Sequence, residues 1–254
     1  MLIILSPSKT LDFSTPHALP ASGDPDLIKE SLKLVRQLKK LKSAELGHLM
    51  SISPKLAYEN ANRYSDWHYP YKEGMAEPAF AAFKGEVYEG LKGWELDSSA
   101  MEYANRHVRI LSGLYGVLKP GDRMLPYRLE MGTALSGKKF DNLYDFWGSN
   151  ITNHIHKALK QSESKTLVNL ASVEYAKALN FKALKTRIVT PMFKEFRNGE
   201  YKFITFSAKR ARGLMTRFAI DQRLKSVEDL KLFDRESYQY MEPLSDENNW
   251  LFVK

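Results

Sequence analysis

Five short apolar runs, separated by much longer stretches, constrain the fold of this chain more than any other feature. They cover residues 2–5, 108–111, 166–170, 187–190 and 201–206. Continuous apolar runs of this length are typical of strands buried on both faces, whereas half-exposed strands alternate apolar and polar residues. Helical patterns lie between most of them. The sequence therefore predicts an α/β fold, or an α+β fold, with a mixed sheet covered by helices.

The chain has 254 residues, which is enough for one large domain with its own core. No internal repeat, low-complexity tract or long Gly/Ser linker marks a boundary, so we expect residues 1–254 to form a single domain. After the helix-start signal Asp24-Pro25, leucines at helical spacing predict a surface helix: Leu27, Leu34, Leu38 and Leu41.

The absence of cysteine excludes disulfides, iron–sulfur clusters and cysteine nucleophiles. Six histidines are present, but the only close pair, His154 and His156, diverges on a helix, and no His-Glu-x-x-His spacing occurs. We therefore expect no metal site and no cofactor. The first apolar run is too short for a signal sequence or a membrane span, which predicts a cytoplasmic protein.

The positive charge of the chain is concentrated in one segment. The formal net charge is +8, and residues 177–223 hold 12 Lys and Arg against three acidic residues. A solvated surface usually mixes both signs, so this imbalance favours a polyanionic partner over a role in solubility alone.

Small hydroxyl residues follow four of the predicted strands, namely Ser6, Ser112, Ser172 and Ser207. If these strands are neighbours and roughly parallel, their ends meet at one edge of the sheet, where α/β proteins usually bind ligands. Four independent helix caps or turns explain the same pattern equally well.

The helix predicted over residues 207–218 has an unusual charge placement. With Ser207 as its cap, Lys209, Arg210 and Arg212 lie in or near the first turn, where the helix dipole disfavours cations. A bound phosphate would remove this conflict, because helix-start amides and arginines both bind phosphate oxygens. A basic solvated helix is the alternative.

A second candidate site covers residues 109–132. Gly113 and Gly116 permit close approach of backbone to a ligand, as in a hairpin between two helices that holds one phosphodiester. Tyr115 and Tyr127 are candidates for stacking on an unpaired base, although core tyrosines are more frequent. Three cations are placed to reach phosphates: Lys119, Arg123 and Arg128.

Two further features concern possible chemistry at the ends of the predicted strands. Residues 6–10 end like a phosphate-binding loop but lack its glycines, so we reject a nucleoside triphosphate site there and keep only Lys9 as a phosphate contact. Glu130 and Glu174 form an acid/base pair if the fold brings them together; otherwise they anchor neighbouring arginines.

Several motifs in combination resemble the YaaA family of bacterial peroxide-stress proteins, over nearly the whole chain. They lie at residues 5–10, 83–88, 112–116, 127–132, 144–147, 169–175 and 209–215. The resemblance implies a single α/β domain with a positively charged cleft and a helix-hairpin-helix element, which binds duplex and branched or bulged DNA. It also implies a role in peroxide stress, lowering free intracellular iron and limiting oxidative DNA damage. No iron-ligand cluster is evident, which favours an indirect route.

The main hypothesis is thus a non-enzymatic protein that binds double-stranded and structured DNA. Its predicted DNA-binding residues are Lys9, Gly113, Gly116, Lys119, Arg123, Tyr127, Arg128, Lys209, Arg210 and Arg212. The alternative is an enzyme that flips a damaged base into a pocket near Tyr127, Glu130 and Glu174. A basic scaffold for RNA or for another protein is a third option.

Overall fold

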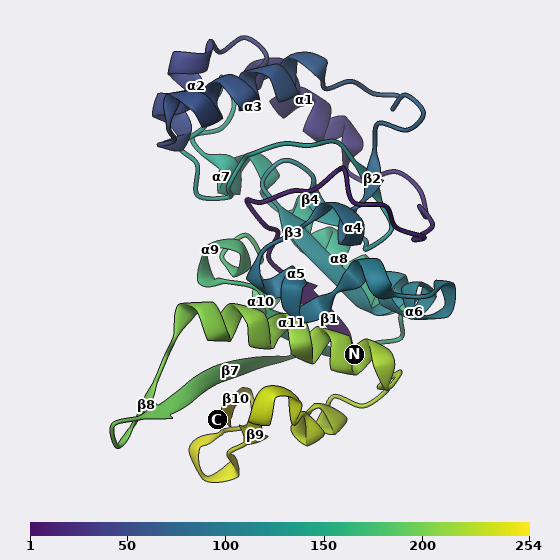
Figure 1. The fold of residues 1–254 in the computed structure, drawn as a ribbon, viewed down its shortest axis with the longest axis vertical. Coiled ribbons are helices and arrows are strands. Elements are labelled where there is room, and N and C mark those ends of the chain that lie inside the picture. The colour runs from purple at the N-terminus through teal and green to yellow at the C-terminus, as the bar shows by residue number, and fades with distance from the viewer.

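An eight-stranded mixed sheet forms the centre of the computed structural model, which describes all residues 1–254 (Figure 1). The strand order is β4-β3-β1-β6-β7-β10-β9, with β8 paired to β7. The strands are β1 (Leu2–Leu5), β3 (Val108–Ser112), β4 (Gly116–Leu118), β6 (Thr166–Leu170), β7 (Arg187–Arg197), β8 (Glu200–Lys202), β9 (Gln239–Tyr240) and β10 (Asn249–Val253). A two-stranded sheet pairs β2 (Glu77–Pro78) with β5 (Arg123–Met124).

The five central strands, β3, β1, β6, β7 and β10, run parallel, whereas β4, β8 and β9 are antiparallel to their neighbours. All residues of β1 and β3 are buried, as expected for strands covered on both faces. The predicted α/β class and mixed sheet are therefore confirmed. The run at 201–206 is the exception, because only its first two residues belong to β8.

Helices cover both faces of the sheet and form a separate layer at one end (Figure 1). In that view α5 (Glu86–Leu91), α6 (Ser98–His107) and α11 (Thr205–Asp221) lie in front, and α8 (Asn150–Gln161) lies behind with α10 (Phe181–Leu184). The end layer holds α1 (Ile28–Leu38), α2 (Ser43–Met50) and α3 (Pro54–Asp66). The remaining short helices are α4 (Ala79–Ala82), α7 (Leu143–Trp147) and α9 (Val173–Ala176), with 3₁₀ turns at Gly93–Glu95, Glu228–Leu232, Arg235–Ser237 and Glu242–Leu244.

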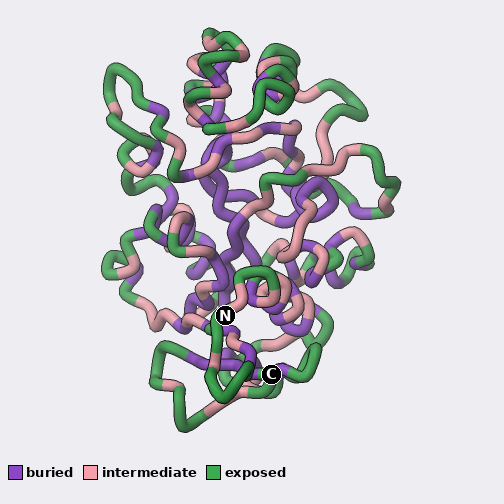
Figure 2. The backbone as a smooth tube through the Cα atoms, turned by 60° about the vertical axis from the view of Figure 1, so that its left-hand side comes forward, coloured by how far each residue is buried: buried purple, intermediate pink, exposed green.

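One hydrophobic core of 67 buried residues joins both ends of the chain, from Met1 to Phe252. Buried positions run through the middle of the molecule in Figure 2, and exposed positions line its outside. The predicted surface helix appears as α1, in which Leu34 and Leu38 are buried. None of the helices has the length and apolar character that crossing a membrane requires.

Helix α11 begins three residues earlier than the predicted cap at Ser207 implies. Thr205 is its first residue and Ile204 its N-cap, which supplies no side-chain hydrogen bond. The prediction that Ser207 caps this helix is wrong, and Lys209 consequently lies in the second turn. Phenylalanine favours strands, so Phe203 and Phe206 account for the predicted strand at 201–206, but both residues are exposed and lie outside the sheet.

Helices α5 and α11 cross in direct backbone contact at two glycines. A Cβ atom on Gly213 would lie 1.7 Å from the carbonyl oxygen of Val87, and one on Gly90 would lie 2.3 Å from the carbonyl oxygen of Arg210. No other residue type fits either position without moving a helix. This crossing fixes where the side chains of α11 lie relative to the start of α5.

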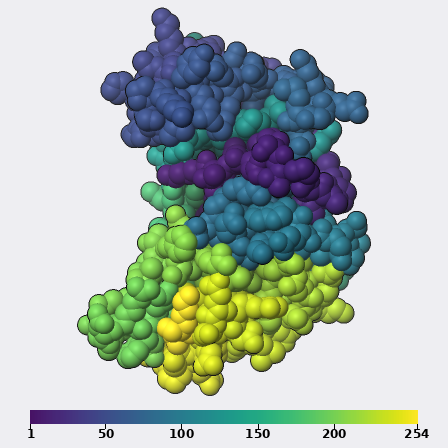
Figure 3. Space-filling view, viewed as in Figure 1, coloured from purple at the N-terminus to yellow at the C-terminus, as the bar shows by residue number.

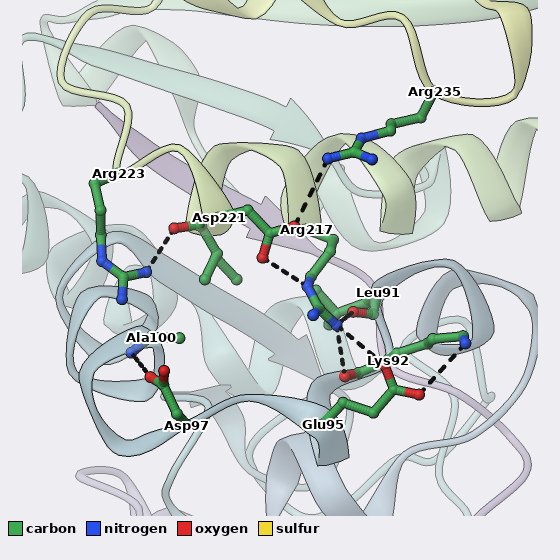
Figure 4. A network of polar contacts seen from close by, with 10 residues as sticks. Leu91, Lys92, Glu95, Asp97, Ala100, Arg217, Asp221, Arg223 and Arg235 are labelled. Atoms are coloured by element: carbon green, nitrogen blue, oxygen red, sulfur yellow. Dashed lines mark hydrogen bonds and ion pairs between the residues drawn. The ribbon is translucent and has the colours of Figure 1, made fainter.

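Polar contacts fasten the other end of α11 (Figure 4). Arg217 donates to the carbonyl oxygens of Leu91 and Lys92 at 3.3 and 3.2 Å, and it pairs with Asp221 at 2.8 Å. Glu95 approaches the same guanidinium at 3.6 Å. The guanidinium thus satisfies carbonyl groups at the C-terminal end of α5, where a cation is also favoured by the helix dipole.

Two hairpin-like elements relate to the predicted helix-hairpin-helix. Residues 113–115 connect the antiparallel strands β3 and β4, so the Gly-x-x-Gly stretch at 113–116 lies in a β-hairpin and does not join two helices. A short connection between two packed helices occurs elsewhere, at residues 51–53 between α2 and α3, with Ser51 in the left-handed region at φ 50°.

Replacing Gly213 with alanine tests the helix crossing. We expect Gly213→Ala to lower the free energy of unfolding by at least about 1–3 kcal/mol, the usual cost of overpacking. Urea unfolding followed by circular dichroism measures the change. Gly47→Ala is the control, because the nearest atom to its Cβ would be a side-chain carbon, Ala57 Cβ, at 3.3 Å. An equal effect of both substitutions would contradict the tight crossing.

Candidate functional site

A cleft of about 450 Å³ opens where the carboxyl ends of β1 and β6 meet the crossing of α5 and α11. Five segments distant in sequence line it. They are residues 6–10 after β1, 84–88 at the start of α5, 127–130 in the loop after β5, 172–175 at the start of α9, and Lys209 with Arg212 on α11.

Hydroxyl groups at the strand ends connect these segments. Ser6 Oγ accepts from the backbone N–H of Ser172 at 2.8 Å and donates to Ser172 Oγ at 3.2 Å. Ser112, at the end of β3, lies 2.7 Å from the hydroxyl of Tyr127, whose ring lines the cleft. The predicted gathering of strand ends at one edge is therefore confirmed for three of the four serines, and Ser207 follows no strand.

The loop after β1 is held against the segment before α5. The backbone N–H of Lys84 donates to the carbonyl oxygen of Thr10 at 3.0 Å. Gly85 has φ 94°, and a Cβ atom there would lie 2.9 Å from Ser8 Oγ. A glycine is thus needed for the loop and the helix start to approach this closely.

Three charged side chains form a chain of ion pairs along the cleft wall. Lys9 Nζ lies 2.5 Å from Glu130 Oε2, and Arg128 Nη2 lies 3.3 Å from Glu130 Oε1. Arg128 is largely buried, and its Nε has no hydrogen-bond partner. Glu130 therefore balances two cations, one of which keeps an unused donor.

The two cations from α11 have no such counterion. Neither Lys209 nor Arg212 has a carboxylate within 4 Å or a side-chain hydrogen bond, although both line the cleft. Burial lowers the pKa of Arg212 from its ordinary value, which means that its charge is poorly solvated. Arginine nevertheless stays protonated, so the cleft contains a partly desolvated, unpaired positive charge.

Aromatic hydroxyls close the inner end of the cleft. Burial raises the pKa of Tyr88, Tyr127 and Tyr175 well above that of free tyrosine. These phenols are therefore neutral at physiological pH and serve as hydrogen-bond donors, not as bases. Tyr88, for example, donates to the carbonyl oxygen of Ser6 at 3.0 Å.

The structure divides the residues that the sequence singled out. Five line the cleft together: Lys9, Tyr127, Arg128, Lys209 and Arg212. Lys119 and Arg123 lie outside it and pair with acidic residues before α1, at 3.2 Å from Asp26 and 2.6 Å from Asp24. Arg210 lies on another side of α11 and pairs with Glu236 at 2.6 Å.

The two glycines of the second candidate site are buried. A Cβ atom on Gly113 would lie 2.3 Å from the carbonyl oxygen of Leu129, and one on Gly116 would lie 2.8 Å from the Trp147 ring. Each glycine therefore makes room for this protein's own groups. Tyr115 is also a core residue, and its hydroxyl accepts from the indole N–H of Trp67 at 3.2 Å.

The segment 84–88 lines the cleft but was not predicted as part of the site, although residues 83–88 form one of the family motifs. Lys84 from this segment lines the cleft, lies 3.8 Å from Asp12 and stacks its Nζ 3.5 Å from the centre of the Trp94 ring. Glu86 adds a carboxylate to the lining. The sequence feature that could have identified this segment is Lys84-Gly85, a cation and a glycine directly before the helix α5.

Glu130 and Glu174 both line the cleft, so the fold brings the candidate acid/base pair to one place. Glu174 Oε1 accepts from the backbone N–H of Gly132 at 2.8 Å, and Glu130 holds the two cations described above. No group of three or more His, Cys, Asp or Glu side chains is arranged to hold a metal ion.

These features define a class of α/β protein in which a mixed-charge cleft at the carboxyl edge of the sheet carries uncompensated cations. A family model described as "Peroxide stress protein YaaA" matches residues 1–244. The chain is 48% identical to a UPF0246 protein of Aliivibrio fischeri over 254 residues, covering all of this chain and 98% of the relative. It is 45% identical, with the same coverage, to a UPF0246 protein of Neisseria gonorrhoeae. The chain belongs to the YaaA peroxide stress protein family.

Neutralising Glu130 tests whether it acts as an internal counterion. Glu130→Gln releases Lys9 and Arg128 for an external anion, so we expect polyanion affinity to rise by about three- to tenfold, the effect of roughly one charge. Elution from immobilised heparin at a higher salt concentration measures it. Glu89→Gln, which alters an acidic residue outside the cleft lining, is the control. Weaker retention of the Glu130 variant would contradict this role.

Proposed function

We propose that this protein binds DNA through the cleft, as a non-enzymatic member of the peroxide stress response. The observation that carries the proposal is the pair of unpaired cations, Lys209 and Arg212, at the carboxyl edge of the sheet. A phosphate group supplies the charge and the hydrogen-bond acceptors that this pair lacks. Duplex and branched or bulged DNA are the proposed partners.

The surroundings of the two cations support a polymeric anion. Lys9, Lys84 and Arg128 line the same cleft, and the segment 177–223 brings further positive charge from β7 and α11. Phosphate contacts of this kind position a nucleic acid without reading its sequence. We therefore propose binding that depends little on DNA sequence and strongly on salt.

The helical pair α2–α3 is the proposed location of the helix-hairpin-helix element. The N–H groups of Ser51 and Ile52 already donate to carbonyl oxygens within α2, but those of Ser53 and Lys55 at the exposed start of α3 have no backbone acceptor, so a phosphodiester could accept from them. The cationic cleft and this element then contact different parts of one DNA molecule.

A double alanine variant of the cleft cations tests the proposal. We expect Lys209→Ala/Arg212→Ala to reduce the slope of log Kd against log salt by about 2, because two phosphate contacts are lost. Fluorescence anisotropy with a labelled duplex at several salt concentrations measures the slope. Arg210→Ala is the matched control on the same helix, since Arg210 pairs with Glu236.

Equal loss in the double variant and the Arg210 control would show that general charge, and not the cleft, determines affinity. An unchanged slope in the double variant would place the DNA elsewhere. Absence of salt-dependent binding by the unaltered protein would overturn the proposal as a whole.

The proposed cellular role is protection of DNA during peroxide stress, in the cytoplasm, together with limitation of free iron. Support for this role comes from membership in the family and from the proposed DNA binding. A deletion strain complemented with the double variant tests the link: if DNA binding mediates protection, the variant fails to restore peroxide survival while it accumulates normally.

A base-processing enzyme is the second candidate, because Glu130, Glu174 and Tyr127 line one cleft. A carboxylate that acts on water next to a flipped base would suit glycosidic hydrolysis. Long incubation with damaged and mismatched duplexes decides between the two: release of a base or cleavage of a strand, abolished by Glu174→Gln, would favour the enzyme.

A further inference from the structure

A projecting hairpin beside the cleft carries an unusual group of exposed aromatic rings. The hairpin arm comprises residues 192–206, from the outer part of β7 through β8 to the start of α11, and projects at the lower left in Figures 1 and 3. Phe196, Phe203 and Phe206 are 57%, 57% and 60% exposed, and no other phenylalanine in the chain is a large exposed hydrophobic residue.

The arm leaves the sheet beyond Phe196, whose backbone N–H still donates to the carbonyl oxygen of Lys254 at 2.8 Å. Strand β7 pairs with β10 up to Lys194 and with β8 from Glu195 to Arg197. Phe193 faces inward and stacks on Phe252, with ring centres 5.6 Å apart. Since side chains alternate along a strand, the neighbouring positions Lys194 and Phe196 face the opposite side.

Four aromatic residues of the arm together make what we call its aromatic surface: Phe196, Tyr201, Phe203 and Phe206. The strand register places Tyr201 directly across from Phe196, and their ring centres are 5.2 Å apart. Phe203 comes directly after the last residue of β8, and its side chain is also exposed. An exposed surface of this kind is costly in water unless a partner covers it.

Charge and position indicate which partner covers the surface. Lys194 beside the rings has no carboxylate within 4 Å, and Phe206 lies one helical turn before Lys209, which lines the cleft. An unpaired cation therefore lies next to Phe196 on β7 and another next to Phe206 on α11. Aromatic rings interleaved with cations match a nucleic acid strand, whose bases stack and whose phosphates are negative.

We propose that the hairpin arm stacks on unpaired bases of DNA whose backbone the cleft holds. This inference rests on the proposed DNA binding and adds to it the element of the protein that contacts bases exposed in a bulge, a branch point or a single strand. In a perfect duplex these bases are already stacked on their neighbours, so the arm gains nothing from them.

The test compares the variant Phe196→Ala/Phe203→Ala/Phe206→Ala with the unaltered protein on three labelled DNAs: a perfect duplex, the same duplex with a bulge of about three nucleotides, and a single strand. We expect at least about tenfold weaker binding to the bulged duplex and the single strand, the effect of losing one stacked base, and less than about twofold on the perfect duplex. The three side chains are exposed, so the urea midpoint should not change.

Two further measurements distinguish base stacking from a general loss of exposed apolar surface. Leu232→Ala removes an apolar side chain that is more exposed than the three rings, at 73%, on the 3₁₀ helix at residues 228–232, and should leave binding to all three DNAs unchanged. 2-Aminopurine in the bulge should be quenched by the unaltered protein and by the variant Phe196→Tyr/Phe203→Tyr/Phe206→Tyr, but not by the alanine variant.

The outcomes distinguish this inference from the proposed function. Equal loss on duplex and bulged DNA, or unchanged binding to both, overturns the stacking role while DNA binding stands; the second result assigns the aromatic surface to a protein partner or a second copy of the chain. Failure of the unaltered protein to bind any DNA overturns both proposals.

Discussion

The backbone contact between α5 and α11 is the constraint on which the candidate site depends. Because Gly90 and Gly213 carry no side chain, the two helices approach until Cβ atoms would collide with carbonyl oxygens. Arg217 then fastens the far end of the same pair. The crossing holds Lys209 and Arg212 over strand ends that lie far away in sequence, and it leaves the hairpin arm to project from the start of α11.

The central sheet could be predicted from sequence because burial on both faces leaves a strong local pattern. The apolar runs in β1, β3 and β6 correspond closely to strands, and parallel pairing brings Ser6, Ser112 and Ser172 to one edge. The pattern failed at 201–206, where aromatic residues usual in strands lie on an exposed arm and a helix start. Aromatic content alone does not show whether a ring faces a core or water.

The contents of the cleft were less predictable, because the sequence does not show which counterion each cation meets. Lys119 and Arg123 looked equivalent to Lys209 and Arg212, but acidic residues before α1 pair with the first two only. Gly113 and Gly116 were similarly ambiguous, since a glycine can make room for a ligand or for other groups of the same protein, as it does here. That Arg210 and Arg212 lie on different sides of α11 could have been predicted from sequence, because helical residues two positions apart differ by about 200° around the helix axis.

The unpaired state of Arg212 connects stability with binding. A buried lysine can lose its proton, but arginine remains charged, so the free protein bears the cost of poor solvation at this position. Arg128 bears less of that cost because Glu130 balances its charge, and Lys9 is both paired with Glu130 and mostly exposed. Under the proposed DNA binding, a phosphate would meet two kinds of cation: it would compete with Glu130 at one wall, whereas at α11 it would supply a missing partner. The proposed binding would therefore gain most free energy at α11, next to the hairpin arm.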